Sequence, residues 1–184
     1  VFGAKIVAVS DSCGGVYNPK GLSIRDLMVH KAATGAVQHF PGAKNITNEE
    51  LLELPVDILI LAALENVINR RNAPNIRARM VAEFANDPVN NEADEILFER
   101  SITVLPDFLT NGGGVIVSYF EMVQNFSLDR WEEETVHRKL EKKMVDAYRA
   151  VYDLAEKNNT PLREAAYSIA IARVVGAMKM RGWI

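Results

Sequence analysis

The sequence LPDFLTNGGGVIVSYFEMVQN, Leu105–Asn125, organises the rest of the chain. Asn111 precedes three consecutive glycines, which allow a tight turn and close approach by another group. Such a turn, followed by a helix start, presents backbone N–H groups to a polar or anionic ligand, although the glycines can also serve packing alone. Four apolar residues at helical spacing predict a helix with one buried face: Val115, Tyr119, Met122 and Val123.

The composition is that of a globular protein and argues against several function classes. The 184 residues suit one domain or one domain with a helical appendage. A net charge of −3 gives no electrostatic basis for binding nucleic acid or an anionic membrane. The single cysteine, Cys13, fits a reducing cytoplasm, and the three histidines lie too far apart in sequence to predict a metal site. The most apolar helical stretch, 165–178, is too short to span a bilayer.

Short apolar runs alternate with helix signals over the first 105 residues, which predicts a doubly wound, mostly parallel α/β sheet. The continuous apolar run 57–63 is typical of a parallel strand covered on both faces. The other expected strands are 5–9, 79–83 and 102–105. The expected helices are 23–33, 47–54, 65–69 and 91–100. Ser23 is expected to cap the first, and the second starts with a capping box at Thr47.

The last third of the chain is predicted to be helical. Residues 131–158 carry one apolar face at helical spacing: Leu140, Met144, Ala147, Val151 and Ala155. Pro161 suits the start of a second helix that runs to about Arg181. This last helix is apolar on nearly all sides, so we expect it to pack on something outside the chain.

Polar residues follow several expected strands, where ligands bind in open α/β sheets. Asp11 is placed to accept from a ribose hydroxyl pair, or else caps its own turn. Asn86 and Asn111 are placed to bind a carboxamide or carboxylate, or else stabilise their loops. Ser118 lies one helical turn past Gly114, although most helical serines bond back to their own backbone. No nucleophile–base or carboxylate pair is evident, and nothing marks Asp107 or Glu121 as catalytic.

Four collinear blocks resemble glutamate dehydrogenases of the hexameric archaeal and bacterial type. The blocks are KIVAVSDSCGGVYNPKGL (5–22), ITNEELLELPVDILILAALENVI (46–68), VAEFANDPVNNEADEIL (81–97) and the stretch 105–125. The resemblance implies a Rossmann-like sheet that lacks its first β-α unit, with C-terminal helices. Residues 1–125 would be part of a dinucleotide-binding domain, and 126–184 would pack on an N-terminal substrate domain.

The reaction that the resemblance implies is NAD(P)-dependent oxidative deamination of L-glutamate to 2-oxoglutarate and ammonia by hydride transfer, in a cytoplasmic homo-hexamer. The family's catalytic lysine and aspartate and its Gly-rich phosphate turn correspond to sequence before Val1. No catalytic residue is therefore expected in this chain, which we expect to be inactive by itself. Two alternatives stay open: a related amino-acid dehydrogenase, and a non-catalytic remnant that binds a nucleotide or a partner.

The resemblance also implies roles for individual residues. The implied cofactor-binding residues are Asp11 at the adenosine ribose, Ser12, Ala62 and Ala63 towards the nicotinamide, and Asn86 and Asn111 beside it. Ser118 would bind the side-chain carboxylate of glutamate, with Val115 lining the pocket. Ser118 argues against leucine and phenylalanine dehydrogenases, which need an apolar residue there. Asp11 favours NAD over NADP because it repels a 2′-phosphate, unless basic residues outside the chain reverse that preference.

Two features depart from the family pattern. Asp87 replaces the usual glycine of an A-N-G-P turn, and Gly112 replaces the usual alanine. In the strand order 3-2-1-4-5-6, a first strand would lie between 5–9 and 57–63. Without it we expect two unpaired strand edges and an uncovered apolar face.

Overall fold

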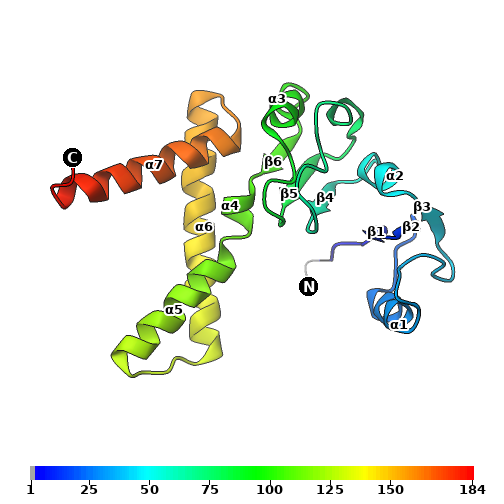
Figure 1. The fold of residues 1–184 in the computed structure, drawn as a ribbon, viewed down its shortest axis with the longest axis horizontal. Coiled ribbons are helices and arrows are strands. Elements are labelled where there is room, and N and C mark those ends of the chain that lie inside the picture. Colours follow the sequence, from blue (N-terminus) through cyan, green and yellow to red (C-terminus); the bar gives the residue numbers. More distant parts are fainter. Residues whose placement is uncertain (1–2) are drawn as a thin grey trace. The chain divides into compact units, whose positions relative to one another are not determined.

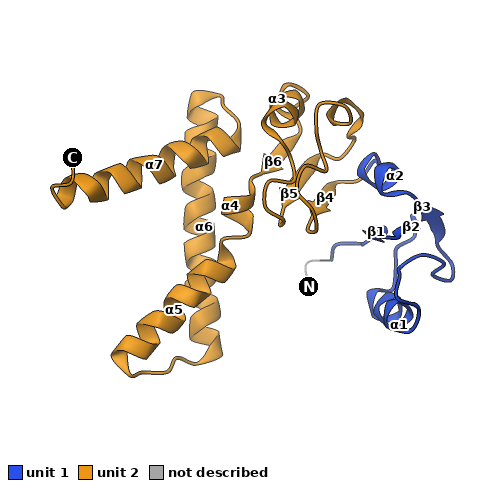
Figure 2. Cartoon of the chain, viewed as in Figure 1, with its two compact units in different colours: residues 1–55 blue, residues 56–184 orange. Residues whose placement is uncertain are grey.

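The computed structural model describes residues 3–184 and divides into two compact units, residues 1–55 and 56–184 (Figures 1 and 2). Each unit contains its own three-stranded sheet. The mixed α/β fold with C-terminal helices agrees with the sequence prediction. Within the described residues, no helix combines the length and hydrophobicity that a membrane span requires.

Unit 1 is an antiparallel sheet with two helices. Its elements are β1 (Ala8–Asp11), β2 (Gly14–Tyr17), α1 (Ile24–Thr34), β3 (Lys44–Ile46) and α2 (Asn48–Leu52). The sheet order is β1-β2-β3. A small core of Val16, Leu27 and Val37 lies between the sheet and α1. Both helix starts are as predicted: Ser23 caps α1, and Thr47 and Glu50 form a reciprocal capping box on α2.

The first strand differs from its prediction in position and in pairing. We expected a parallel strand at 5–9, whereas β1 begins at Ala8 and pairs antiparallel with β2. The reason is a two-residue turn at Ser12–Cys13, which folds the chain directly back, with Asp11 opposite Gly14. Gly14 adopts φ +130°, a conformation that favours glycine. Gly14 and Gly15, which follow this turn, therefore begin the second strand.

Unit 2 contains a parallel sheet followed by helices. Its elements are β4 (Ile58–Leu61), the 3-10 turn η1 (Ala73–Asn75), β5 (Met80–Glu83), α3 (Asn91–Glu99), β6 (Thr103–Leu105), α4 (Asp107–Thr110), α5 (Gly113–Ser127), α6 (Glu133–Asn158) and α7 (Leu162–Met180). The sheet order is β4-β5-β6, with β5 in the centre and buried along most of its length. The predicted strands at 57–63, 79–83 and 102–105 are all present in shortened form.

The edge strand β4 is covered on one face only, which corrects the prediction of two covered faces. Leu59 and Leu61 are buried, whereas Ile58 is 54% and Ile60 58% exposed. Among the described residues, β4 pairs only with β5, and β1 pairs only with β2. Each sheet thus has a free edge at β4 or β1, the two strands that were predicted to flank a further strand.

Two of the predicted helical features in unit 2 are wrong. Residues 65–69 form a turn at Glu65–Asn66 and a parallel bridge from Ile68 to Val89, because the backbone N–H groups of Asn66 and Ile68 donate to the carbonyls of Asp87 and Pro88. In α5 the helical period is right but the face is not. Phe120 is the buried residue of this helix and packs against Trp131, while the apolar stripe predicted to be buried is largely exposed.

The C-terminal helices α6 and α7 contact each other and cross at a steep angle (Figure 1). Their shared core consists of Leu109, Val151, Ala155, Ala165 and Ala166. The predicted apolar face of α6 is confirmed, with burial increasing towards Val151 and Ala155. One side of α7 remains exposed, with Tyr167, Ile171 and Val174 more than half accessible.

Candidate functional site

The carboxylate of Asp11 is held by three donors within unit 1. Its Oδ1 accepts from the N–H of Cys13 at 2.9 Å, and its Oδ2 accepts from Lys31 Nζ at 2.9 Å and from the N–H of Val37 at 3.0 Å. Burial raises the pKa of Asp11, but these hydrogen bonds outweigh it and lower the pKa below its usual value. A carboxylate offers about four lone-pair sites, so one on Oδ1 is left for an external donor. Asp11 therefore caps its turn, as the alternative reading expected, and retains room for one further hydrogen bond.

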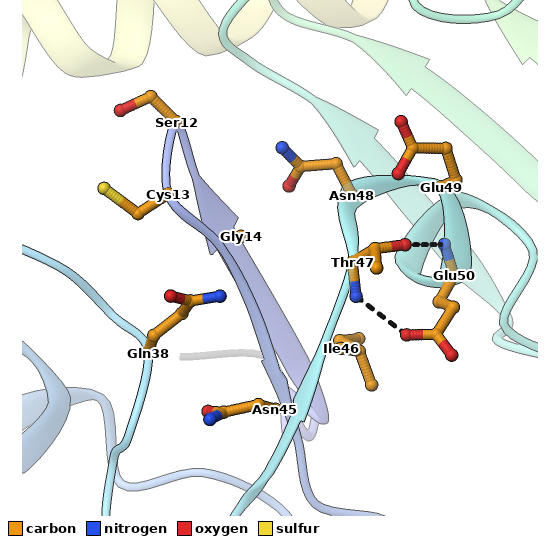
Figure 3. A pocket seen from close by; sticks show the side chains of 10 residues that line it. All are labelled: Ser12, Cys13, Gly14, Gln38, Asn45, Ile46, Thr47, Asn48, Glu49 and Glu50. Atoms are coloured by element: carbon orange, nitrogen blue, oxygen red, sulfur yellow. Dashed lines mark hydrogen bonds between the residues drawn. The ribbon is translucent and has the colours of Figure 1, made fainter.

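An open hollow of about 380 Å³ lies beside Asp11 in unit 1 (Figure 3). Ser12, Cys13 and Gly14 form one wall, and the polar side chains of Gln38, Asn45, Thr47 and Asn48 line the rest together with Ile46, Glu49 and Glu50. The capping box occupies the Thr47 hydroxyl and one oxygen of Glu50. Asn45 is bonded through both amide atoms to His39, and Asn48 Nδ2 donates to the Asp11 carbonyl. The polar groups that remain, among them Ser12 and Gln38, suit a neutral polar ligand, such as a sugar, better than an anion beside two glutamates.

In unit 2 the predicted site residues lie after the carboxyl ends of the parallel strands. Ala62 and Ala63 follow β4 and are exposed, which leaves that strand end open to a ligand. Asn86 follows β5, and Asn111 ends α4, which follows β6. The structure brings these two residues together, since Asn111 Nδ2 donates to Asn86 Oδ1 at 2.8 Å. An amide donor on Asn86 and an amide acceptor on Asn111 remain without hydrogen bonds to the described residues.

Asp87 adopts the left-handed conformation that its position requires. Its φ of +48° explains why glycine suits this turn and why aspartate, which tolerates the conformation better than most residues, is accepted. Asp107 Oδ2 accepts from the N–H of Asp87 at 2.9 Å, and the Asp87 carbonyl accepts from Asn66. Asp107, which the sequence did not distinguish, thus anchors the loop that carries Asn86.

Of the three consecutive glycines, the first belongs to a turn and the other two begin a helix. None of Gly112, Gly113 and Gly114 has a positive φ, and the last two belong to α5 itself. A Cβ on Gly114 would meet nothing within 4 Å, so this position leaves the first turn of α5 open to another group. The predicted turn lies at Asn111–Gly112, between α4 and α5, and needs no left-handed backbone, while the open approach is at Gly114.

Val115 and Ser118 lie three residues apart on α5 and share an exposed face. The Ser118 hydroxyl makes no hydrogen bond within the described residues, in contrast to Ser127, whose hydroxyl donates to the Val123 carbonyl. The common structural role of a helical serine therefore does not account for Ser118. Val115 is 75% exposed, so any pocket that it lines must be completed by groups outside the described residues.

A buried charged cluster beneath the carboxyl end of the sheet was missed by sequence reasoning. Arg163, at the start of α7, contacts Glu83 of β5, Asp94 of α3 and Asp107 of α4. Burial raises the pKa of Glu83 to about 7, against the opposing effect of Arg163 and the Asp107 N–H. The available signal was a glutamate in an apolar strand and an arginine in an apolar helix, since such charges are rarely buried without partners.

The described residues contain no group of histidine, cysteine or acidic side chains that could hold a metal ion. A second hollow of about 560 Å³ lies at the amino ends of β5 and β6, between Arg79, Arg100 and Thr103. It is at the opposite end of the strands from Asn86 and Asn111. Within unit 2, the carboxyl end of the sheet is therefore the candidate ligand-binding edge.

Comparisons with known proteins agree with this architecture. The sequence model of the glutamate/leucine/phenylalanine/valine dehydrogenase family matches residues 1–182. Glutamate dehydrogenase of Thermotoga maritima is 51% identical over 180 residues, which cover 98% of this chain and 43% of that protein. The cryptic catabolic NAD-specific glutamate dehydrogenase of Bacillus subtilis is 46% identical over 99% of this chain and 42% of its own length.

Among solved structures, the hetero-hexameric glutamate dehydrogenase of Thermus thermophilus, in its leucine-bound form, superposes with a TM-score of 0.87 at 33% identity. The match covers 96% of this chain and 42% of the Thermus chain. The chain thus spans less than half the length of these relatives. Since the family model extends over nearly the whole sequence, the chain belongs to the glutamate/leucine/phenylalanine/valine dehydrogenase family.

Proposed function

We propose that the chain is the cofactor-binding portion of an NAD(P)-dependent glutamate dehydrogenase, which converts L-glutamate to 2-oxoglutarate and ammonia in the cytoplasm. The observation that carries the proposal is the hydrogen-bonded pair Asn86–Asn111 at the carboxyl end of the parallel sheet. Its free donor and free acceptor complement a carboxamide, which itself presents one acceptor and one donor group. Nicotinamide carries this group, and the bound dinucleotide would supply the hydride chemistry.

The residues of unit 1 fit the other end of a dinucleotide. Asp11 retains one acceptor site for a ribose hydroxyl, and the neighbouring polar hollow has room for a sugar. A negative charge here disfavours a 2′-phosphate, although Lys31, 2.9 Å from the carboxylate, neutralises part of it. We therefore propose NAD as the preferred cofactor, with some use of NADP. The Bacillus relative, at 46% identity, is named as NAD-specific.

Glutamate is the proposed substrate because of Ser118. Its hydroxyl is exposed, makes no bond within the described residues and lies one helical turn from the open Gly114. A hydrogen bond from a hydroxyl to the side-chain carboxylate of glutamate would contribute about 1.5–3 kcal/mol. Leucine or phenylalanine in the same place would leave this hydroxyl unpaired. The relatives from Thermotoga and Bacillus are both named glutamate dehydrogenases.

The exposed apolar surface supports the proposal that residues 126–184 pack on a substrate domain. Within this range, Tyr167, Ile171 and Val174 on one side of α7 are more than half exposed. Patches of this kind mark interaction surfaces in soluble proteins. The free edges of β1 and of β4 each favour pairing with a further strand. A hexamer, here of identical chains, is the proposed assembly, because the Thermus structure is named a hetero-hexameric glutamate dehydrogenase.

The test is the initial rate of nicotinamide reduction by the complete enzyme that contains this chain, with glutamate or leucine as substrate and NAD or NADP as cofactor. We expect turnover with glutamate, and a higher kcat/KM with NAD than with NADP. Turnover of leucine but not glutamate would assign the chain to a related amino-acid dehydrogenase. Failure of the complete, folded enzyme to bind either dinucleotide would favour a non-catalytic remnant.

A further inference from the structure

The charged cluster around Arg163 is not among the residues proposed above to contact the cofactor or the substrate. Arg163 is only 8% exposed, and Glu83 is inaccessible. The Arg163 guanidinium lies 2.5 Å from Glu83 Oε1, 3.4 Å from Asp94 Oδ2 and 3.7 Å from Asp107 Oδ1. One positive charge therefore faces three carboxylates, each from a different element of unit 2.

Core stability alone is a weak explanation for such a cluster. Taking charges out of water is costly, and well-packed apolar residues often replace buried ion pairs without loss of stability. The planar guanidinium, with five N–H donors, can contact several carboxylates in fixed directions, which a packing role does not need. The geometry favours a role in which the relative positions of β5, α4 and α7 matter.

Hydrogen bonds connect the cluster to the first member of the amide pair. Glu83 Oε2 accepts from the N–H of Asp107 at 2.8 Å, and Asp107 Oδ2 accepts from the N–H of Asp87 at 2.9 Å. Asp87 directly follows Asn86 and holds the left-handed conformation of that loop. Arg163 is thus two carboxylates away from the backbone that sets the direction of the Asn86 side chain.

A second connection reaches the other member of the pair. The hydroxyl of Thr110 donates to the backbone carbonyl of Glu83, and Thr110 directly precedes Asn111. The first turn of α4 is also fixed, because Asp107 accepts from the N–H of Phe108 at 2.7 Å. Asn86 and Asn111 are therefore supported from beneath by the same two acidic residues, Glu83 and Asp107.

We propose that Arg163 is a positioning residue that, through Glu83 and Asp107, holds the Asn86–Asn111 pair in the geometry that binds the nicotinamide carboxamide. The inference rests on the proposed function, in which these two amides contact the cofactor. It couples α7, a helix outside the binding edge, to the orientation of the cofactor. A displacement of 1 Å at such a site can reduce the reaction rate by about a hundredfold.

The decisive substitution is Arg163→Lys in the complete enzyme, because lysine keeps the charge but has no fork to span three carboxylates. We expect the KM for the dinucleotide to rise about tenfold while the KM for glutamate changes less than about twofold. Arg173→Lys, an exposed position on the same helix, is the matched control and should change neither constant. A variant that is merely less stable would lose kcat, through a smaller folded fraction, without a change in either KM.

A double-mutant cycle with Asn86→Ala shows whether Arg163 acts through the amide pair. In the Asn86→Ala background, Arg163→Lys should raise the dinucleotide KM by less than about twofold, since the group that it positions is gone. Equal effects in both backgrounds would overturn the inference, and so would an unchanged dinucleotide KM in Arg163→Lys alone. If Arg163→Lys does not fold, Asp107→Asn replaces it in the same cycle, with the same criterion.

Failure of the inference can be distinguished from failure of the proposed function. A wild-type enzyme that binds no dinucleotide contradicts the proposed function and with it the inference. A wild-type enzyme that uses the dinucleotide, loses affinity on Asn86→Ala and is unaffected by Arg163→Lys contradicts the inference alone.

Discussion

Replacement of Asp11 by asparagine separates two roles of this residue, which are to cap its own turn and, as proposed, to bind a ribose hydroxyl of the cofactor. The carboxylate accepts three hydrogen bonds, from Cys13, Lys31 and Val37. Asparagine is similar in size but has only one acceptor oxygen. Its NH₂ group must therefore face one of the N–H donors that the carboxylate now accepts from. The less costly orientation keeps the oxygen towards Val37 and Lys31 and turns the NH₂ group towards Cys13, whose N–H lies at an exposed turn.

The size of the effect follows from the exposure of the partners. Hydrogen bonds to a charged group contribute about 1.5–3 kcal/mol each, but the Lys31 side chain is 48% exposed and its share must be discounted for solvent screening. The Cys13 N–H can turn to water. The remaining loss of stability has two sources: the hydrogen bond to the Val37 N–H is no longer charge-assisted, and part of the ion pair with Lys31 is lost. We set their sum at about 2 kcal/mol. If local opening controls amide exchange, this corresponds to about 30-fold faster exchange of the Val37 N–H.

The assay is hydrogen exchange of individual amides combined with the KM for NAD. Asp57→Asn is the control, because it makes the same change in charge in the ion pair of Asp57 with Arg79, both of whose side chains are exposed. Faster exchange at Val37 with an unchanged KM for NAD would make Asp11 a purely structural residue. A rise of about tenfold in the KM for NAD would show that Asp11 also binds a ribose hydroxyl of the cofactor. Unchanged exchange at Val37 would refute the reasoning, because the three hydrogen bonds would then contribute nothing.

Three further predictions concern unit 2. Glu83 has a folded-state pKa of about 7 against an ordinary value of 4.5, so the folded state holds the proton more tightly than the unfolded state does. Its contribution to stability is therefore complete below pH 4.5 and declines by up to about 3 kcal/mol as the pH rises through 7. Glu83→Gln should flatten the pH dependence of the urea-measured stability over this range. Asp87→Gly should leave stability within about 1 kcal/mol of wild type, whereas Asp87→Ala at φ +48° should be about 1–2 kcal/mol less stable than the glycine variant in the same urea titration. Ser118→Ala should lower kcat/KM for glutamate about ten- to a hundredfold in steady-state assays, and an unchanged value would remove glutamate as the assigned substrate.

Local signals in the sequence predicted the features that depend on neighbouring residues. The capping box at Thr47 and the Ser23 cap each involve residues three apart, so the sequence contains both partners. The apolar run at 57–63 indicated a strand correctly, but whether both of its faces are covered depends on packing that no local pattern records. Ile58 and Ile60 are apolar and yet exposed in this chain.

The face of α5 shows the same limit in a helix. Its apolar residues surround most of the axis, so the helical period alone could not decide between the stripe through Phe120 and the stripe through Tyr119. Contact with Trp131 selected Phe120. The Arg163–Glu83 pair spans 80 positions in the sequence, and neither residue has a local feature that names the other. That Asn86 and Asn111 lie close together was predictable, because both follow strands of one parallel sheet.

The most direct test of the account is the dissociation constant of the complete enzyme for NAD and for the analogue in which an acetyl group replaces the nicotinamide carboxamide. The analogue keeps the carbonyl acceptor but lacks the NH₂ donor that would meet Asn111 Oδ1. We predict that Asn111→Ala weakens NAD binding about fivefold more than it weakens binding of the analogue, the equivalent of one neutral hydrogen bond. Equal losses for both dinucleotides, or no loss for either, would contradict the claim that the Asn86–Asn111 pair holds the cofactor.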